Sequence, residues 1–320
     1  MRRLVILAAA LAALTGCQAA GSISDGWFGG QPTLPSSDSA GLIGEMSTYR
    51  TAEEDTLPDV AHKLKVGFVE LRTANPTVDV WLPGGGKELV VPTAHLLPDA
   101  PREGIVINLP EMRLYHFDDR GKATSYPIGV GRDGWDTPKG TTTVVRKKEK
   151  PTWYPPASIR REQPDLPKAV PPGPENPLGS HAIYLGWPAY LIHGTNEPLG
   201  VGRRVSHGCI RLYPEHIPLL YEAVAKGTPV AVVDQPLKWA WIGDDLYVEA
   251  HPTLAQADDI EEDREIEPVA APAFMNEIEQ EAAGKGRKLD RDLLERVLAE
   301  RRGYPIRVTP SPPLIPWLDL

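Results

Sequence analysis

The sequence predicts a mostly β fold: a β-sandwich over residues 104–234 with one helix behind a lone cysteine, joined to a small α+β unit over 47–93 and a C-terminal extension over 235–320. Short apolar stretches between Pro and Gly turns indicate the sandwich. A strand–helix–helix–strand order indicates the small unit, and an amphipathic helix marks the extension. The 320 residues leave room for two such domains and linkers.

The strands of the β region are short and closely spaced. Those at 104–109 and 112–117 flank Pro110-Glu111, which favours a hairpin. A helix is expected from about 214 to 226, before a closing strand at 229–233. The remaining strands are expected at 126–130, 140–146, 182–184 and 190–193.

The small unit starts with a strand at 48–52, followed by a helix that Asp55-Thr56 can cap. Gly67 separates this helix from a second one, which stops at Asn75-Pro76, and a strand follows at 88–91. The apolar side of the first helix is formed by Leu57, Val60, Ala61 and Leu64.

Part of this unit is similar to a known carbohydrate-binding module. Asp55-Thr56-Leu57, Asn75-Pro76 and Val91-Pro92 resemble the pattern of LysM modules, although Glu54 replaces the usual Gly and Pro58 is unexpected. The resemblance implies binding to N-acetylglucosamine chains such as the glycan strands of peptidoglycan. The alternative is a packing domain without carbohydrate affinity.

The N-terminus, MRRLVILAAALAALTGCQAA, has a charged start and an apolar run that is short for a membrane span, as secretory signals have. Leu14-Thr15-Gly16-Cys17 resembles a bacterial lipoprotein signal, which implies removal of residues 1–16 and acylation of Cys17. Gln18 is similar to the residue found in lipoproteins of the outer membrane. We therefore expect a periplasmic protein with a lipid anchor in the inner leaflet of the outer membrane; a plain signal peptide or a frayed helix is the alternative.

Residues 17–46 are rich in Gly, Ser and Pro and are predicted to form a flexible tether. The net charge of −9 argues against a nucleic-acid partner, and no second long apolar segment follows.

In the extension, a strand is expected at 245–250, a solvated acidic linker at 258–267, and a helix capped by Asp290 and ended by Gly303.

Cys209, in VSHGCIRL, is the only other cysteine besides Cys17. Exported proteins usually pair their cysteines, so a lone thiol is either a buried filler or a reactive group. A reactive thiol needs a base or a positive charge, and His193 and His207 are near in sequence. Gly208 permits a sharp turn that can expose N–H groups to an oxyanion. Positive charge is offered by Arg203, Arg204 and Arg211.

Two other interpretations of these motifs are weaker. A zinc site built from His193, His207 and Cys209 would lack a fourth ligand, and no HExxH motif is present. Gly129 to Gly134 fits G-x-G-x-x-G, but Trp135 and Pro138 disfavour the helix that a dinucleotide site needs. We therefore expect neither a metal nor a cofactor.

The stretch HGTNEPLGVGRRVSHGCIRL, residues 193–212, resembles the motif of the YkuD family of L,D-transpeptidases. Gly129-Val130-Gly131 and Thr137-Pro138-Lys139-Gly140 are similar to the upstream turn of that family. The resemblance covers residues 104–234, and Arg211 is similar to the residue of the ErfK/YbiS-like branch.

The resemblance implies a role for each residue of the site. Cys209 would be the nucleophile, and His193 would be its base, oriented by the backbone oxygen of Gly194. His207, Gly208 and Cys209 would line the oxyanion region, and Ser206 would belong to the same oxyanion or substrate-binding set. Arg211 would face the substrate, and Tyr184 would lie in the substrate groove.

The implied reaction is a two-step acyl transfer. Cys209 would form a thioester with the third residue of a peptidoglycan tetrapeptide stem, and D-alanine would leave. An amine of another stem, or a lysine of an outer-membrane lipoprotein, would then accept the acyl group. The alternatives are a hydrolase that uses water and a non-catalytic wall-binding lipoprotein.

Overall fold

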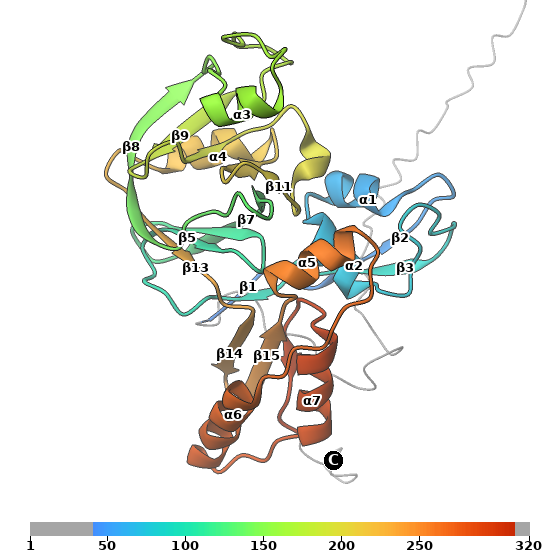
Figure 1. The fold of residues 1–320 in the computed structure, drawn as a ribbon. Helices are drawn as coiled ribbons and strands as arrows, with labels where there is room; N and C mark the ends of the chain where they lie inside the picture. The colour runs from blue at the N-terminus through green and yellow to red at the C-terminus, as the bar shows by residue number, and fades with distance from the viewer. Residues whose placement is uncertain (1–40, 311–320) are drawn as a thin grey trace, which may run out of the picture.

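The structure, a computed structural model, describes residues 41–310 (Figure 1). A large β-sheet forms the centre of the molecule, and the small α+β unit lies beside it. Most of the C-terminal extension forms a lobe below them, drawn in brown, orange and red, while its first helix, α5 (Leu254–Glu261), lies against the α+β unit. Cys17, the expected lipidation site, lies outside the described residues. Within the described range, no helix is both long enough and apolar enough to span a membrane.

The central sheet closes on itself. The strand order is β11-β7-β12-β10-β9-β8-β13-β5-β6, and β6 also pairs with β7, so the ends of the sheet are joined. The strands are β5 (Gly104–Asn108), β6 (Arg113–Phe117), β7 (Ala123–Gly131), β8 (Gly140–Glu149), β9 (His181–Leu185), β10 (Leu191–His193), β11 (Arg204–Ser206), β12 (Ile210–Leu212) and β13 (Pro229–Val233).

This closure corrects the sandwich that we expected, although the domain is mostly β as predicted. Strand β7 is longer than the segment predicted at 126–130. Residues 123–127 pair with β6, whereas Ile128 and Gly129 pair with β12. One long strand therefore belongs to both halves of the sheet and connects them into a barrel.

Apolar side chains of the sheet pack against a helix that follows the lone cysteine. This helix is α4 (His216–Ala223), within the range expected from the sequence, and it lies against β9. Ile183, Ile192 and Ile210 are fully buried in the same core as Ile217 of α4. The residues that alternate with these isoleucines, among them His193 and Arg211, point to the other face of the sheet.

The small α+β unit has the expected order β2 (Ser47–Arg50), α1 (Leu57–Leu64), α2 (Phe68–Ala74) and β3 (Glu88–Val91). We call it the βααβ unit. The Thr56 side chain accepts the N–H of Asp59 and so caps α1. Before it, β1 (Leu42–Ile43) pairs with β4 (His95–Leu96), and Leu42 is buried. The folded body therefore begins before the tether boundary drawn at residue 46.

The βααβ unit shares its core with the barrel. The N–H of Val69 donates to the carbonyl of Gly202 at 3.1 Å, and Tyr213 Oη donates to the carbonyl of Val66 at 2.8 Å. A Cβ on Gly202 would come within 2.2 Å of the Cα of Gly67, so only glycine permits this approach. The two parts therefore form one packed body.

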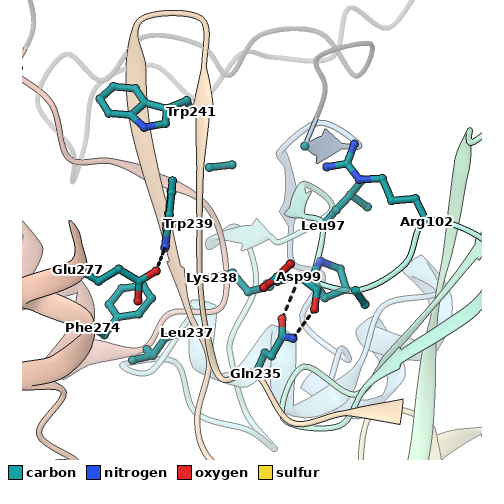
Figure 2. A pocket seen from close by; sticks show the side chains of 14 residues that line it. Leu97, Asp99, Arg102, Gln235, Leu237, Lys238, Trp239, Trp241, Phe274 and Glu277 are labelled. Atoms are coloured by element: carbon teal, nitrogen blue, oxygen red, sulfur yellow. Dashed lines mark hydrogen bonds between the residues drawn. The ribbon is translucent and has the colours of Figure 1, made fainter. Parts of the chain in front are cut away.

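The C-terminal extension is a small sheet with helices. Its elements are β14 (Leu237–Ile242), β15 (Asp245–Ala250), α5 (Leu254–Glu261), α6 (Pro272–Gly284), α7 (Arg291–Glu300) and β16 (Ile306–Arg307). A groove of about 600 Å³ runs along β14, between α6 and the loop at 97–102. Figure 2 shows the side chains that line it. Trp239 Nε1 donates to Glu277 of α6 there at 2.7 Å.

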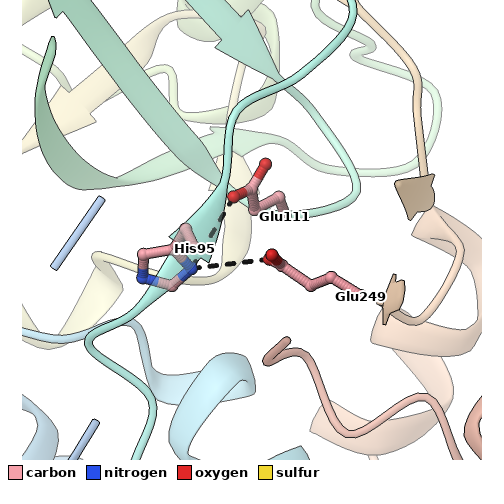
Figure 3. Close-up of side chains that lie close together, drawn as sticks. All are labelled: His95, Glu111 and Glu249. Carbon is pink, nitrogen blue, oxygen red and sulfur yellow. Dashed lines mark ion pairs between the residues drawn. The ribbon is translucent and has the colours of Figure 1, made fainter. Parts of the chain in front are cut away.

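A buried ionic cluster joins the extension to the rest of the protein. Lys238 Nζ lies 2.8 Å from Glu111 and 3.0 Å from Glu249, and all three side chains are at most 2% exposed. His95 lies beside the same carboxylates (Figure 3), and Glu70 of α2 pairs with both His95 and Arg113. Because an isolated buried charge is costly, these contacts fix the three parts to one another.

Candidate active site

The backbone before β12 forms a tight turn that two hydroxyl groups hold in place. Ser206 Oγ donates to the carbonyl of Cys209 at 2.6 Å and accepts the N–H of Gly208 at 3.1 Å. Thr137 Oγ1 donates to the carbonyl of Gly208 at 2.9 Å and accepts the N–H of Gly131 at 3.2 Å. The position of the thiol is therefore set by backbone contacts on both sides.

Gly208 is required by the shape of this turn. Its φ is 95°, and a Cβ there would lie 2.8 Å from Tyr190 Cε1. A side chain at this position would thus be both strained and in contact with an aromatic ring. Because the N–H of Gly208 is bound to Ser206, it can serve an oxyanion only if Ser206 gives up that bond.

Strand register places the thiol and the base candidate on one face of the sheet. β10 and β12 are parallel, with Ile192 opposite Ile210 and His193 opposite Arg211. The two isoleucines are buried in the core, so His193 and Arg211 point to the other face. Cys209 directly precedes Ile210 and therefore lies on the face of His193.

The His193 imidazole is oriented by the backbone. Nδ1 lies 2.5 Å from the carbonyl oxygen of Gly194, which can only accept, so Nδ1 carries the proton and Nε2 keeps its lone pair. Burial, followed by the positive charge of Arg211, lowers the pKa of His193 to about 4. The ring is thus neutral near pH 7 and can accept a proton at Nε2.

The Cys209 thiol is partly buried and protonated at rest. Its sulfur lies 3.6 Å from the carbonyl oxygen of Ala189. Burial raises the pKa of the thiol, and its contact with the Leu191 backbone and the charge of Arg211 offset this only in part. No hydrogen bond joins Cys209 to His193 in the structure of residues 41–310, and catalytic contacts of this kind often tighten only with substrate. The resting pair is therefore a neutral thiol beside a neutral imidazole.

His207 lies in the same turn, but its ring points to a different set of partners. Nε2 lies 3.0 Å from Glu162 Oε2 and 3.1 Å from a guanidinium nitrogen of Arg132. The ring also packs edge-on against Trp135, with 4.8 Å between centroids. Glu162 ends the short helix α3 (Ala157–Glu162), so His207 connects the motif turn to the loop at 150–180.

Arg211 and Tyr184 share the face of the nucleophile. Tyr184 pairs with Leu191, which alternates with His193 along β10 and so points to the same side. Arg211 is half-buried and lies 3.8 Å from the exposed carboxylate of Glu197. Both side chains are therefore placed where a bound substrate could reach them.

Arg203 and Arg204 do not face the thiol, contrary to our expectation. The Arg203 guanidinium stacks on Phe68 at 3.7 Å, and Arg204 hydrogen-bonds Asp258 and Asp136. The acidic run at 258–267 is accordingly not only a solvated linker, because it starts inside α5 and neutralises Arg204. These two arginines fix the βααβ unit and α5 to the barrel.

Two contributors to the site were missed from the sequence. Thr137 was noted only as part of a turn, although its hydroxyl supports the turn at Gly208. Ala189 has a φ of 69°, which is rare for a residue other than glycine, and its carbonyl faces the thiol. Neither role has a local sequence signal, because both depend on contacts across the fold.

The residues considered for zinc do not form a metal-binding group. Among the described residues, the set whose ligand atoms lie close enough is His95, Glu111 and Glu249. There the ammonium of Lys238 already lies within 3.0 Å of both carboxylates, so a divalent cation would be repelled. This donor set therefore does not fit a metal while Lys238 is present.

The chain is similar to known proteins over most of its length. A family model described as the YkuD L,D-transpeptidase catalytic domain matches residues 102–232. The probable L,D-transpeptidase YcfS of Escherichia coli K12 is 40% identical over 279 residues, 83% of this chain and 85% of that protein. The probable L,D-transpeptidase YbiS of the same strain is 38% identical over 96% of this chain and 99% of its own.

Among solved structures, the catalytic domain of the Enterococcus faecium L,D-transpeptidase is 24% identical and matches 42% of this chain and 100% of its own, with a TM-score of 0.34. Identities of 38–40% to curated relatives, across most of both sequences, show the family directly. This chain belongs to the L,D-transpeptidase family and carries a YkuD catalytic domain.

Proposed function

We propose that the protein is a cysteine-dependent L,D-transpeptidase of peptidoglycan. The observation that carries this proposal is the placement of Cys209 and His193 on one sheet face, with His193 Nδ1 held by Gly194 and Nε2 available. A nucleophile and a base, the base oriented by a third group, are what covalent acyl transfer requires.

The neutral pair defines the first half-reaction. As Cys209 Sγ attacks the carbonyl of the third stem residue, His193 Nε2 takes the thiol proton. The C–N bond to D-alanine then breaks, and His193 returns the proton to the departing amine. A thioester between Cys209 and the stem remains.

The second half-reaction reverses these roles. An acceptor amine attacks the thioester, His193 takes a proton from that amine, and the C–S bond breaks as Cys209 is restored to a thiol. An amine from another stem gives a 3→3 cross-link, a lipoprotein lysine gives wall anchoring, and water gives hydrolysis. We propose an amine acceptor.

Product analysis separates these outcomes. The protein without residues 1–17 is incubated with tetrapeptide muropeptides, with or without a lysine peptide, and the products are read by mass spectrometry. Cross-linked dimers with release of D-alanine support the proposal, and Cys209→Ala should abolish both. Tripeptide as the only product would identify a hydrolase, and no reaction would contradict the proposed function.

We also propose a lipid anchor at Cys17 and a periplasmic location in the inner leaflet of the outer membrane. The support is the sequence Leu14-Thr15-Gly16-Cys17 behind an apolar run, with Gln18 next. Cys17→Ser should prevent acylation and move the protein from membrane to soluble fractions. If Cys17→Ser protein stays in the outer-membrane fraction, the anchor is wrongly assigned.

We propose further that the βααβ unit is a LysM-like module that binds glycan strands. Trp81 and Leu82 are 65% and 78% exposed in its α2–β3 loop, and the neighbouring Val80 carbonyl accepts the N–H of Leu57 at the start of α1. An exposed apolar pair on a loop is typical of a binding surface.

The unit shares a core with the barrel, so point substitutions test it better than deletion does. Trp81→Ala with Leu82→Ser should weaken co-sedimentation with purified sacculi while leaving D-alanine release from soluble muropeptides unchanged. Tyr154→Ala, at a side chain that is 70% exposed elsewhere, is the control. Equal binding by both variants would show that the unit is a packing domain.

A further inference from the structure

The face of the sheet that carries Cys209 also carries an unused basic side chain. Arg146 of β8 pairs with Tyr184 of β9, and Tyr184 pairs with Leu191 of β10. The thiol of Cys209 lies beside the Leu191 backbone. Arg146, Tyr184, Leu191 and Cys209 therefore form one row across four neighbouring strands, on the face opposite the core.

The alternation along β8 supports this placement. Lys147, next to Arg146, reaches the carbonyl of Val224 and the ring of Tyr221 on the core side. Arg146 must therefore point to the other side, together with Lys148, which pairs with Ala182. Both basic side chains are exposed.

Arg146 is held in place by an aromatic ring rather than by an acid. Its Cζ lies 3.6 Å from the centroid of the Tyr184 ring. The Arg146 guanidinium makes no hydrogen bond or ion pair with any residue between 41 and 310 in the structure. A guanidinium stacked through its flat face keeps its N–H edges free, and these edges match a carboxylate in a bidentate fashion.

The distance to the thiol suits a substrate contact. Neighbouring strands are spaced by about 4.8 Å, so a guanidinium above β9 lies roughly 10 Å from Cys209, which directly precedes β12. An extended peptide covers that distance with about three residues. In a chain with a net charge of −9, two exposed basic side chains on the face that carries the nucleophile favour an acidic ligand.

We propose that Arg146, stacked on Tyr184, binds a carboxylate of the donor stem peptide and selects stems in which that carboxylate is free. This inference rests on the proposed transpeptidase function and adds a specificity-determining residue to it. Arg146 takes no part in the bond changes at the thioester. Its effect belongs to the first half-reaction, in which the donor binds.

The test uses tetrapeptide stems in which each free carboxylate is converted to an amide in turn. D-alanine release is measured as kcat/KM for wild type, Arg146→Gln, Arg146→Lys and the control Arg120→Gln, which removes the same charge from a distant exposed loop. One amidation should reduce the wild-type value roughly 10-fold to 100-fold, the usual range for a charged hydrogen bond. Arg146→Gln should lose that discrimination, with the loss mainly in KM, and Arg146→Lys should keep part of it.

Thiol alkylation by iodoacetamide, a small neutral reagent, reports whether the variant retains the active-site fold. Unchanged alkylation with lost discrimination supports the proposal. The proposal would be overturned if Arg146→Gln discriminates between the stems as wild type does. It would also be overturned if Arg146→Gln lowers kcat/KM equally for all stems. If Arg146→Gln slows the alkylation of Cys209, Arg146→Lys becomes the deciding variant. Full wild-type discrimination by Arg146→Lys would then overturn the proposal. Failure of wild type to release D-alanine would instead refute the transpeptidase function itself.

Discussion

Replacement of Lys238 by Met should strongly destabilise the whole protein. Lys238 Nζ lies 2.8 Å from Glu111, 3.0 Å from Glu249 and 2.6 Å from the carbonyl of Leu96, and it is 2% exposed. The substitution leaves two buried carboxylates without this cation, although Glu249 keeps its contact with His251. Loss of one partner from a buried ion pair costs about 3–5 kcal/mol.

Urea unfolding measures this loss directly. A chain of this size should have a slope near the top of the usual range, so the midpoint should fall by about 1–2 M. Circular dichroism and the alkylation of Cys209 should report the same transition, because the cluster joins the extension to the barrel. Lys139→Met, which removes an exposed pair with Asp234, should hardly move the midpoint.

Two results would refute this reasoning. One is a Lys238→Met midpoint close to that of Lys139→Met, which would mean that the buried charges are not coupled to folding. The other is a separate early transition that leaves Cys209 protected, which would mean that the extension unfolds alone. Glu249→Gln in the Lys238→Met background should recover part of the loss, since it removes one uncompensated charge.

Three further predictions concern the site. Gly208→Ala should lower both stability and D-alanine release. The control is Gly227→Ala, which should lower stability alone, because Gly227 has a nearly equal φ of 94° but nothing within 4 Å of a Cβ. Equal D-alanine release by both variants would contradict the steric argument. The urea midpoint of unfolding should fall as the pH drops below about 6.5, because burial lowers the pKa of His95, His193 and His216. Below that pH the unfolded chain binds more protons than the folded protein does. The stability that the neutral histidines contribute is therefore complete only above the pKa that histidine has in the unfolded chain. His193→Gln should remove about 3 kcal/mol of that dependence between pH 7 and pH 4, and an unchanged dependence would count against the buried neutral ring. Glu162→Gln should speed tryptic cleavage at Arg160 and Arg161, because it releases the contact with His207. Glu175→Gln is the control, and equal rates of cleavage in the two variants would contradict the prediction.

The parts of the fold with a local signal could be predicted from the sequence. The capped helix at Thr56, the turn at Gly208 and the helix behind Cys209 each depend on nearby residues, and the structure has them at the expected positions. Closure of the sheet could not be predicted, because it depends on β7 pairing with strands on both sides. Long-range pairing leaves little trace in a single sequence.

The difference between local signals and long-range pairing also explains which parts of the active site could be predicted. Cys209 and His193 lie in a recognisable motif, whereas the side of the sheet to which each residue points is set by register. Arg203 and Arg204 are as near to the thiol in sequence as Arg211, yet they contact Phe68 and the acids of α5 and the turn at 136. Charge near in sequence therefore did not mean charge near in space.

The pH dependence of D-alanine release is the most direct test of the neutral Cys209–His193 pair. With tetrapeptide stems in excess of enzyme, kcat/KM should stay nearly constant from pH 7 to pH 5 and decline only as the pH approaches about 4, where His193 becomes protonated. Cys209→Ala should show no release at any pH. A decline centred near pH 6.5, or release by Cys209→Ala, would contradict the account.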